Sequence, residues 1–68
     1  MRIKLKYNIG DMVEFNYFAC NKIGTIQIVD TFPNSTLVEY DIYVQNENRL
    51  YKHIDERYII GLINEIKI

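Results

Sequence analysis

Apolar and polar residues alternate along several short segments of the chain. The clearest segment covers residues 38–44, where Val38, Tyr40, Ile42 and Val44 occupy every second position. A period of two places these four side chains on one face of a β-strand. We therefore predict a half-buried strand here, with its apolar face on the core.

Four further segments show the same period and are predicted to be strands: residues 3–7, 13–17, 24–28 and 49–54. Segments rich in Gly, Pro, Asn and Asp separate them, at residues 8–11, 32–35 and 46–48, with a short connection at 19–22.

Within these strands, the alternation predicts which side chains face inward. We expect Ile26 and Ile28 to point to the same side, and Phe15, Tyr17 and Tyr40 to lie on the core face.

In the last third of the chain, the apolar pattern fits both a strand and a helix. Apolar residues over 54–66 also fit the spacing of an amphipathic helix. Gly61 and the β-branched pair Ile59 and Ile60 disfavour a helix. We predict one helical turn at 55–58 and a strand over 59–68, with a C-terminal helix packed on a β-meander as the alternative.

Strands at intervals of 8–12 residues predict a small all-β barrel or sandwich. The end segments 3–7 and 63–68 would each be an exposed apolar edge, and pairing them with each other removes both edges. Lys4 and Lys6 would then lie opposite Glu65.

Four short motifs carry a family resemblance: Gly10-Asp11-Met12-Val13, Gly24-Thr25-Ile26, Tyr40-Asp41-Ile42-Tyr43-Val44 and Asp55-Glu56-Arg57-Tyr58-Ile59-Ile60. In their order and spacing, the chain resembles small bacterial and phage SH3-like barrel proteins of the YorP kind, and more loosely KOW and Tudor-type barrels. The resemblance covers roughly residues 8–62 and implies a five-stranded SH3-like barrel with one helical turn before the last strand. It implies no reaction. Because 68 residues are too few for two domains, we expect residues 1–68 to form a single domain.

Composition excludes several classes of protein. Cys20 is the only cysteine, so no internal disulfide can form, which indicates a reducing compartment. No signal peptide and no apolar run of membrane-spanning length is visible, and we expect a cytoplasmic protein. The chain also lacks Trp, which disfavours the recognition of Pro-rich peptides that some SH3 domains perform.

The chain has few side chains that could act as a catalytic nucleophile or base: one Cys, one Ser and one His. Cys20 and His53 are the only pair that could act as nucleophile and base, and nothing supplies an orienting third group or an oxyanion hole. Two Cys or His residues are too few for a structural zinc site. Asp55 and Glu56 are better explained as charges at a helix N-terminus. We predict no enzyme activity, no metal site and no cofactor.

The aromatic residues suggest protein binding. We predict a non-enzymatic module that binds a protein partner, as a phage or prophage accessory protein modulating a host factor would. Its contact residues would be aromatic side chains outside the core and a neighbouring acidic pair. These are Phe18, Phe32, Tyr43, Tyr51, Glu39 and Asp41.

Two alternatives remain open. One is a KOW- or Tudor-like barrel that binds nucleic acid through Arg2, Lys4, Lys6, Arg49 and Lys52. Against it, these residues do not form a dense basic cluster, and the formal net charge is −1. The other is an assembly protein that oligomerises through its end strands.

Overall fold

The computed structural model describes residues 5–63 of the 68-residue chain. Within them it contains five β-strands and two single-turn 3₁₀ helices. The elements are β1 (Met12–Tyr17), β2 (Cys20–Thr31), β3 (Val38–Val44), η1 (Gln45–Glu47), β4 (Arg49–Asp55), η2 (Glu56–Tyr58) and β5 (Ile59–Leu62). The predicted all-β class, with five strands and a helical turn before the last, is confirmed.

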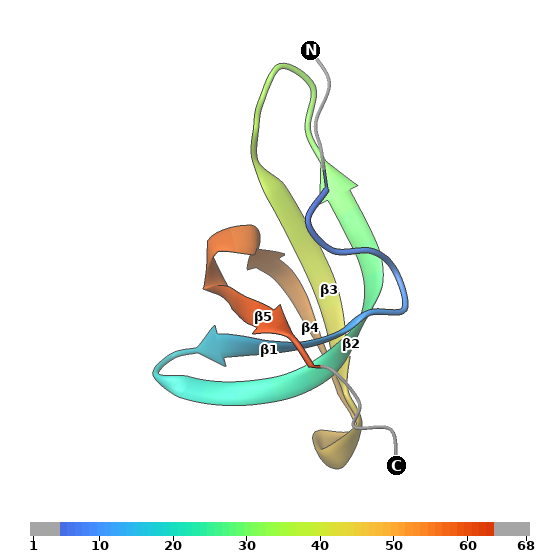
Figure 1. The fold of residues 1–68 in the computed structure, drawn as a ribbon, viewed down its shortest axis with the longest axis vertical. Coiled ribbons are helices and arrows are strands. Elements are labelled where there is room, and N and C mark those ends of the chain that lie inside the picture. Colours follow the sequence, from blue (N-terminus) through green and yellow to red (C-terminus); the bar gives the residue numbers. More distant parts are fainter. Residues whose placement is uncertain (1–4, 64–68) are drawn as a thin grey trace.

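The strands form one antiparallel sheet in the order β4-β3-β2-β1-β5. Figure 1 shows β2 bending so that its first half runs beside β1 and its second half beside β3. The bend folds the sheet onto itself and brings the end of β1 against β4, where the rings of Tyr17 and Tyr51 are 4.7 Å apart.

The sheet is not closed into a barrel: in the described part of the chain, β4 and β5 are its two edges. Leu5, Lys6 and Tyr7 do not form the predicted first strand. Residues 3, 4 and 64–68 lie outside the described residues, and with them the predicted pairing of Lys4 with Glu65.

The turn at Gly10 explains why the first segment leaves the sheet. Gly10 has φ +95°, a conformation open mainly to glycine, and its N–H donates to the Ile26 carbonyl at 2.9 Å. The chain before it is thereby directed over the core, where the Tyr7 ring meets the Tyr40 ring edge-on at 5.9 Å.

The core contains side chains from all five strands. The predicted inward face of β3 is confirmed, because Val38, Tyr40, Ile42 and Val44 are all buried. The remaining core residues are Val13, Phe15, Ile26, Tyr51, Ile54 and Ile59.

Two β-bulges flank the middle of β3 and change which residues face outward. On one side, Ile26 pairs with Ile42 but Ile28 pairs with Asp41, so Gln27 is an extra residue in β2. The bulge reverses the alternation, so Ile26 is buried whereas Ile28 is exposed. The prediction that both point to the same side is therefore wrong.

The second bulge lies between β3 and β4. Tyr40 pairs with Ile54 and Ile42 pairs with Tyr51, so β4 also has an extra residue at this level. His53 lies in the bulge with φ +60°, in the left-handed region. This second bulge places His53 beside Asp41.

Candidate functional site

The turn between β1 and β2 is only two residues long. Tyr17 pairs with Cys20, and Phe18 and Ala19 between them have φ +48° and +67°. Two consecutive left-handed residues give the turn a twist that matches the strands it joins. The predicted connection at 19–22 is thus shorter than expected, because Cys20 already belongs to β2.

Phe18 projects from this turn with 84% of its surface exposed. Its ring packs edge-on against Tyr17 at 4.7 Å, and Tyr17 packs in the same way against the buried Tyr51. A chain of three rings therefore connects the tip of the hairpin to the core.

A groove of about 410 Å³ lies between the hairpin tip and β4. We call it the hairpin groove. It is lined by Asn16, Tyr17, Phe18, Lys52, His53, Ile54, Asp55 and Tyr58.

The β4 side of the groove is held by the η2 turn. Asp55 caps this turn, because its Oδ1 accepts the Arg57 N–H at 3.0 Å. Tyr58 follows at the end of the turn, exposed, with the Arg57 guanidinium 5.6 Å from its ring centre. Asp55 and Tyr58 thus give the groove one acidic and one aromatic side chain.

The structure does not place the predicted contact residues on one face. Phe18 precedes the 12-residue strand β2 and Phe32 follows it, so they lie at opposite ends of that strand. Phe32 and Tyr43 are each half-buried, and the Tyr43 hydroxyl donates to Asn48 Oδ1. Of the six predicted contact residues, only Phe18 is exposed.

Two of the predicted contact residues are buried, and their assignment to an exposed face is wrong. Tyr51, 3% exposed, belongs to the core because the β3–β4 bulge puts it opposite Ile42. Asp41, 6% exposed, lies between the two bulges, and its Oδ1 accepts the His53 N–H at 3.1 Å. The acidic pair with Glu39 is therefore not an open surface.

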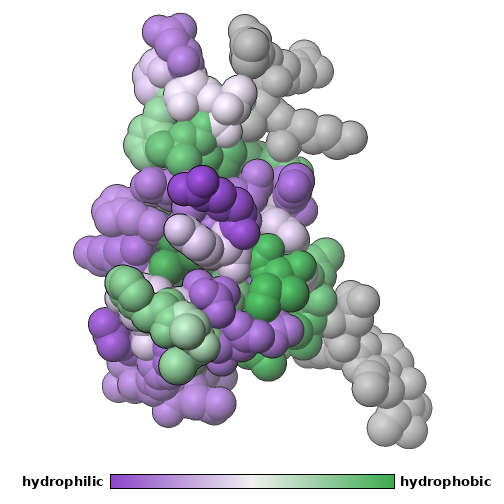
Figure 2. Space-filling view, turned by 90° about the vertical axis from the view of Figure 1, so that its left-hand side faces the viewer, coloured by the Kyte–Doolittle hydropathy of each residue, from purple (hydrophilic) through white to green (hydrophobic). Residues whose placement is uncertain are grey.

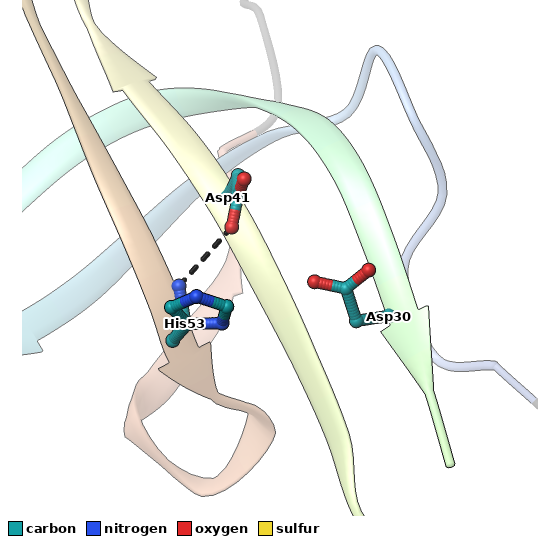
Figure 3. Close-up of side chains that lie close together, drawn as sticks. All are labelled: Asp30, Asp41 and His53. Carbon is teal, nitrogen blue, oxygen red and sulfur yellow. Dashed lines mark hydrogen bonds between the residues drawn. The ribbon is translucent and has the colours of Figure 1, made fainter. Parts of the chain in front are cut away.

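Asp41 instead belongs to a cluster with Asp30 and His53, one residue from each of three neighbouring strands (Figure 3). A possible metal-ligand atom of each lies within 4.8 Å of the other two. Glu39 is adjacent, with Oε1 at 3.2 Å from Nδ1 of His53. The alternation along each strand does not predict this cluster, because the three side chains come together only through the two bulges.

The candidate residues for nucleic-acid binding are dispersed. Arg2 and Lys4 lie outside the described residues. Lys6 borders a shallow depression beside the start of β3, whereas Arg49 lies opposite Val44 at the end of that strand, 4.5 Å above the Tyr51 ring. Lys52 lines the hairpin groove.

The pair considered for catalysis has other contacts. His53 is engaged with Glu39 and Asp41, and the exposed Cys20 lies opposite Tyr17 at the start of β2.

Among the residues that the structure describes, three groups have perturbed pKa values. The hydrogen bond from Lys22 Nζ to Glu47 Oε2, 2.5 Å long, raises the pKa of the lysine and lowers that of the glutamate. The Tyr51 hydroxyl also donates to Glu47 and lowers its pKa further. Burial raises the pKa of Tyr40, and its 2.6 Å hydrogen bond to Glu56 adds to this shift.

No protein-family model, curated protein sequence or solved structure matches this chain. Among residues 5–63, no helix has the length and apolar character needed to cross a membrane.

Proposed function

We propose that this chain is a non-enzymatic module that binds a protein partner at the hairpin groove, with Phe18 as its main anchor. The observation that carries the proposal is the combination of an unfavourable backbone conformation and nearly full exposure at Phe18. The two-residue turn requires the left-handed conformation, but it does not require a bulky, exposed aromatic side chain there.

The backbone cost can be given a magnitude. The left-handed conformation costs a residue with a side chain about 1–2 kcal/mol, and it is rare for bulky residues. Asn and Gly are the residues that such two-residue turns favour. The φ of +48° at Phe18 is therefore an energetic cost. Because 84% of the residue is exposed, burial of its ring offsets little of that cost. Strained, exposed residues of this kind are a reason to infer function.

The groove has the composition of a contact surface. Tyr17, Phe18 and Tyr58 are aromatic, and Lys52 and Asp55 provide polar groups of both signs. Aromatic anchors surrounded by polar groups are typical of the centres of protein interfaces. Figure 2, viewed from the side of the hairpin tip, shows separate apolar areas between polar ones, so the partner would contact a local anchor rather than a broad apolar face.

We further propose that the module belongs with the small SH3-like proteins of bacteria and phages and acts in the cytoplasm on a host factor. The strand order β4-β3-β2-β1-β5, the bent β2 and the 3₁₀ turn before β5 support the SH3-like part of this proposal.

Site-specific photo-crosslinking tests the binding site. A photoreactive phenylalanine analogue replaces Tyr58 in the groove and, in a control protein, replaces Ile60, an exposed apolar residue of β5 outside the groove. We expect a defined protein to be crosslinked from position 58 and not from position 60. The Phe18→Asn change in the first protein should abolish that crosslink.

Two results would contradict the proposal. One is capture of the same proteins from both positions, and the other is undiminished capture after Phe18→Asn. Retention of labelled DNA or RNA by the purified wild-type protein, lost on raising the salt, would favour the nucleic-acid alternative instead.

A further inference from the structure

The cluster of Asp30, Asp41 and His53 lies outside the core, on the face formed by β2, β3 and β4. Figure 3 shows the three side chains directed toward one another from these adjacent strands. Their potential ligand atoms, a carboxylate oxygen from each aspartate and a ring nitrogen from the histidine, all lie within 4.8 Å of each other.

Asp41 is the member that most requires a partner. The residue is 94% buried, since only 6% of its surface is exposed. One carboxylate oxygen accepts the His53 N–H, and the second has no hydrogen-bond partner among residues 5–63. No side-chain polar atom in that part of the chain is both fully buried and unpaired, so solvent still reaches this second oxygen.

Among residues 5–63, no Lys or Arg forms an ion pair with the two aspartates of the cluster. Two carboxylates this close repel each other, and burial strengthens the repulsion. A bound cation would remove it.

Glu39 completes an arrangement that is common around metal-bound histidines. Its Oε1 lies 3.2 Å from Nδ1 of His53. A carboxylate that accepts the Nδ1–H fixes the ring tautomer and leaves Nε2 free to bind a metal ion.

We propose that Asp30, Asp41 and His53 bind one divalent transition-metal ion of the Zn²⁺ class, with Glu39 orienting the imidazole. The imidazole ligand favours a transition metal over Mg²⁺ or Ca²⁺. Three protein ligands leave a fourth position for water. This site goes beyond the proposed function and does not depend on it, although His53 also lines the hairpin groove.

The geometry requires only a small adjustment. Zinc–ligand bonds of about 2.0–2.1 Å in a tetrahedral site separate the ligand atoms by about 3.4 Å. The present separations are at most 4.8 Å, so each would have to shorten by no more than about 1.4 Å to reach this geometry.

The test uses the whole chain, freed of metal with a chelator and titrated with Zn²⁺. Because His53 is the only histidine, both imidazole signals in ¹⁵N NMR belong to it, and only Nδ1 and Nε2 have to be distinguished. We expect saturation at one ion per chain, a large shift of the Nε2 signal and a protonated Nδ1. Mg²⁺ at the same concentration should leave both signals unchanged.

Substitutions identify the ligands. We choose Asp30→Asn rather than a change at Asp41, because Asp41 is buried. We choose His53→Asn because asparagine tolerates the left-handed backbone at this position. Each should weaken Zn²⁺ binding by more than about tenfold, and Glu39→Gln by about 10–100-fold. Circular dichroism without metal shows whether each variant is folded.

Matched controls remove other carboxylate and thiol sites. Glu14→Gln neutralises a half-buried carboxylate on β1, and Cys20→Ser removes the thiol. Both should bind Zn²⁺ like the wild type. The proposal is overturned if the wild type shows no saturable binding, if zinc binds without moving the His53 signals, or if folded Asp30→Asn binds as tightly as Glu14→Gln.

Discussion

Replacing Gly24 by Ala tests the close contact between β2 and β3. A Cβ atom added at Gly24 would lie 2.6 Å from the Tyr43 carbonyl oxygen and 2.7 Å from Cγ2 of Ile42. Non-bonded atoms do not approach this closely, so the strands must separate. One of the two clashing atoms is the Tyr43 carbonyl oxygen, which belongs to the backbone and cannot rotate away as a side chain can.

The expected cost follows from that clash. Overpacking a well-packed site costs about 1–3 kcal/mol, and a backbone obstacle places this change in the upper half of the range. A domain of this size is stabilised by only about 3–5 kcal/mol. At about 4–8 °C for each kcal/mol, Gly24→Ala should lower the unfolding temperature by about 10–20 °C.

Thermal and urea unfolding, followed by far-UV circular dichroism, measures the effect. Gly61→Ala is the matched control, because a Cβ at this β5 glycine meets no atom within 4 Å. It should change the stability by less than about 0.5 kcal/mol. If Gly24→Ala unfolded at the same temperature as Gly61→Ala, the described packing of β2 on β3 would be wrong.

Three further predictions concern single side chains. Tyr40→Phe removes the buried hydroxyl that donates to Glu56 and should lower the free energy of unfolding by about 1–2 kcal/mol; an unchanged urea midpoint would contradict this. Ala19→Gly relieves a left-handed alanine at φ +67° and should raise the unfolding temperature, whereas a decrease would argue against the two-residue turn. Lys22 lowers the pKa of Glu47 in the folded state, so the ion pair stabilises the folded protein. This stabilisation is complete above the ordinary glutamate pKa of 4.5 and is lost as the pH falls through the lower pKa of the folded state. Below pH 4.5, the unfolding temperature of the wild type should therefore fall more steeply than that of Glu47→Gln. Parallel plots of unfolding temperature against pH for the two proteins would refute the ion pair.

The sequence pattern predicted those parts of the fold that depend on local alternation. The inward face of β3 follows from Val38 to Val44 alone, because successive side chains of any strand point to opposite faces. The 3₁₀ turn at η2 and the start of β5 at Ile59 were likewise predicted from residues within the segment.

The features that alternation could not predict depend on partner strands. A bulge is an extra residue relative to the neighbouring strand, and nothing in β2 or β4 alone marks it. Tyr51 and Asp41 were therefore assigned to the wrong environment, and the cluster with Asp30 and His53 was missed. Of the predicted contact residues, Phe18 was correctly placed outside the core, because it falls next to the predicted connection at 19–22 rather than on the inward face of a strand.

The unfolding temperature of Phe18→Asn tests most directly whether this aromatic side chain serves binding rather than folding. We expect the variant to unfold at or above the temperature of the wild type, because Asn accepts the left-handed turn and little buried surface is lost. A decrease of several degrees would show that Phe18 supports the hairpin itself, and the proposed anchor at the hairpin groove would lose its basis.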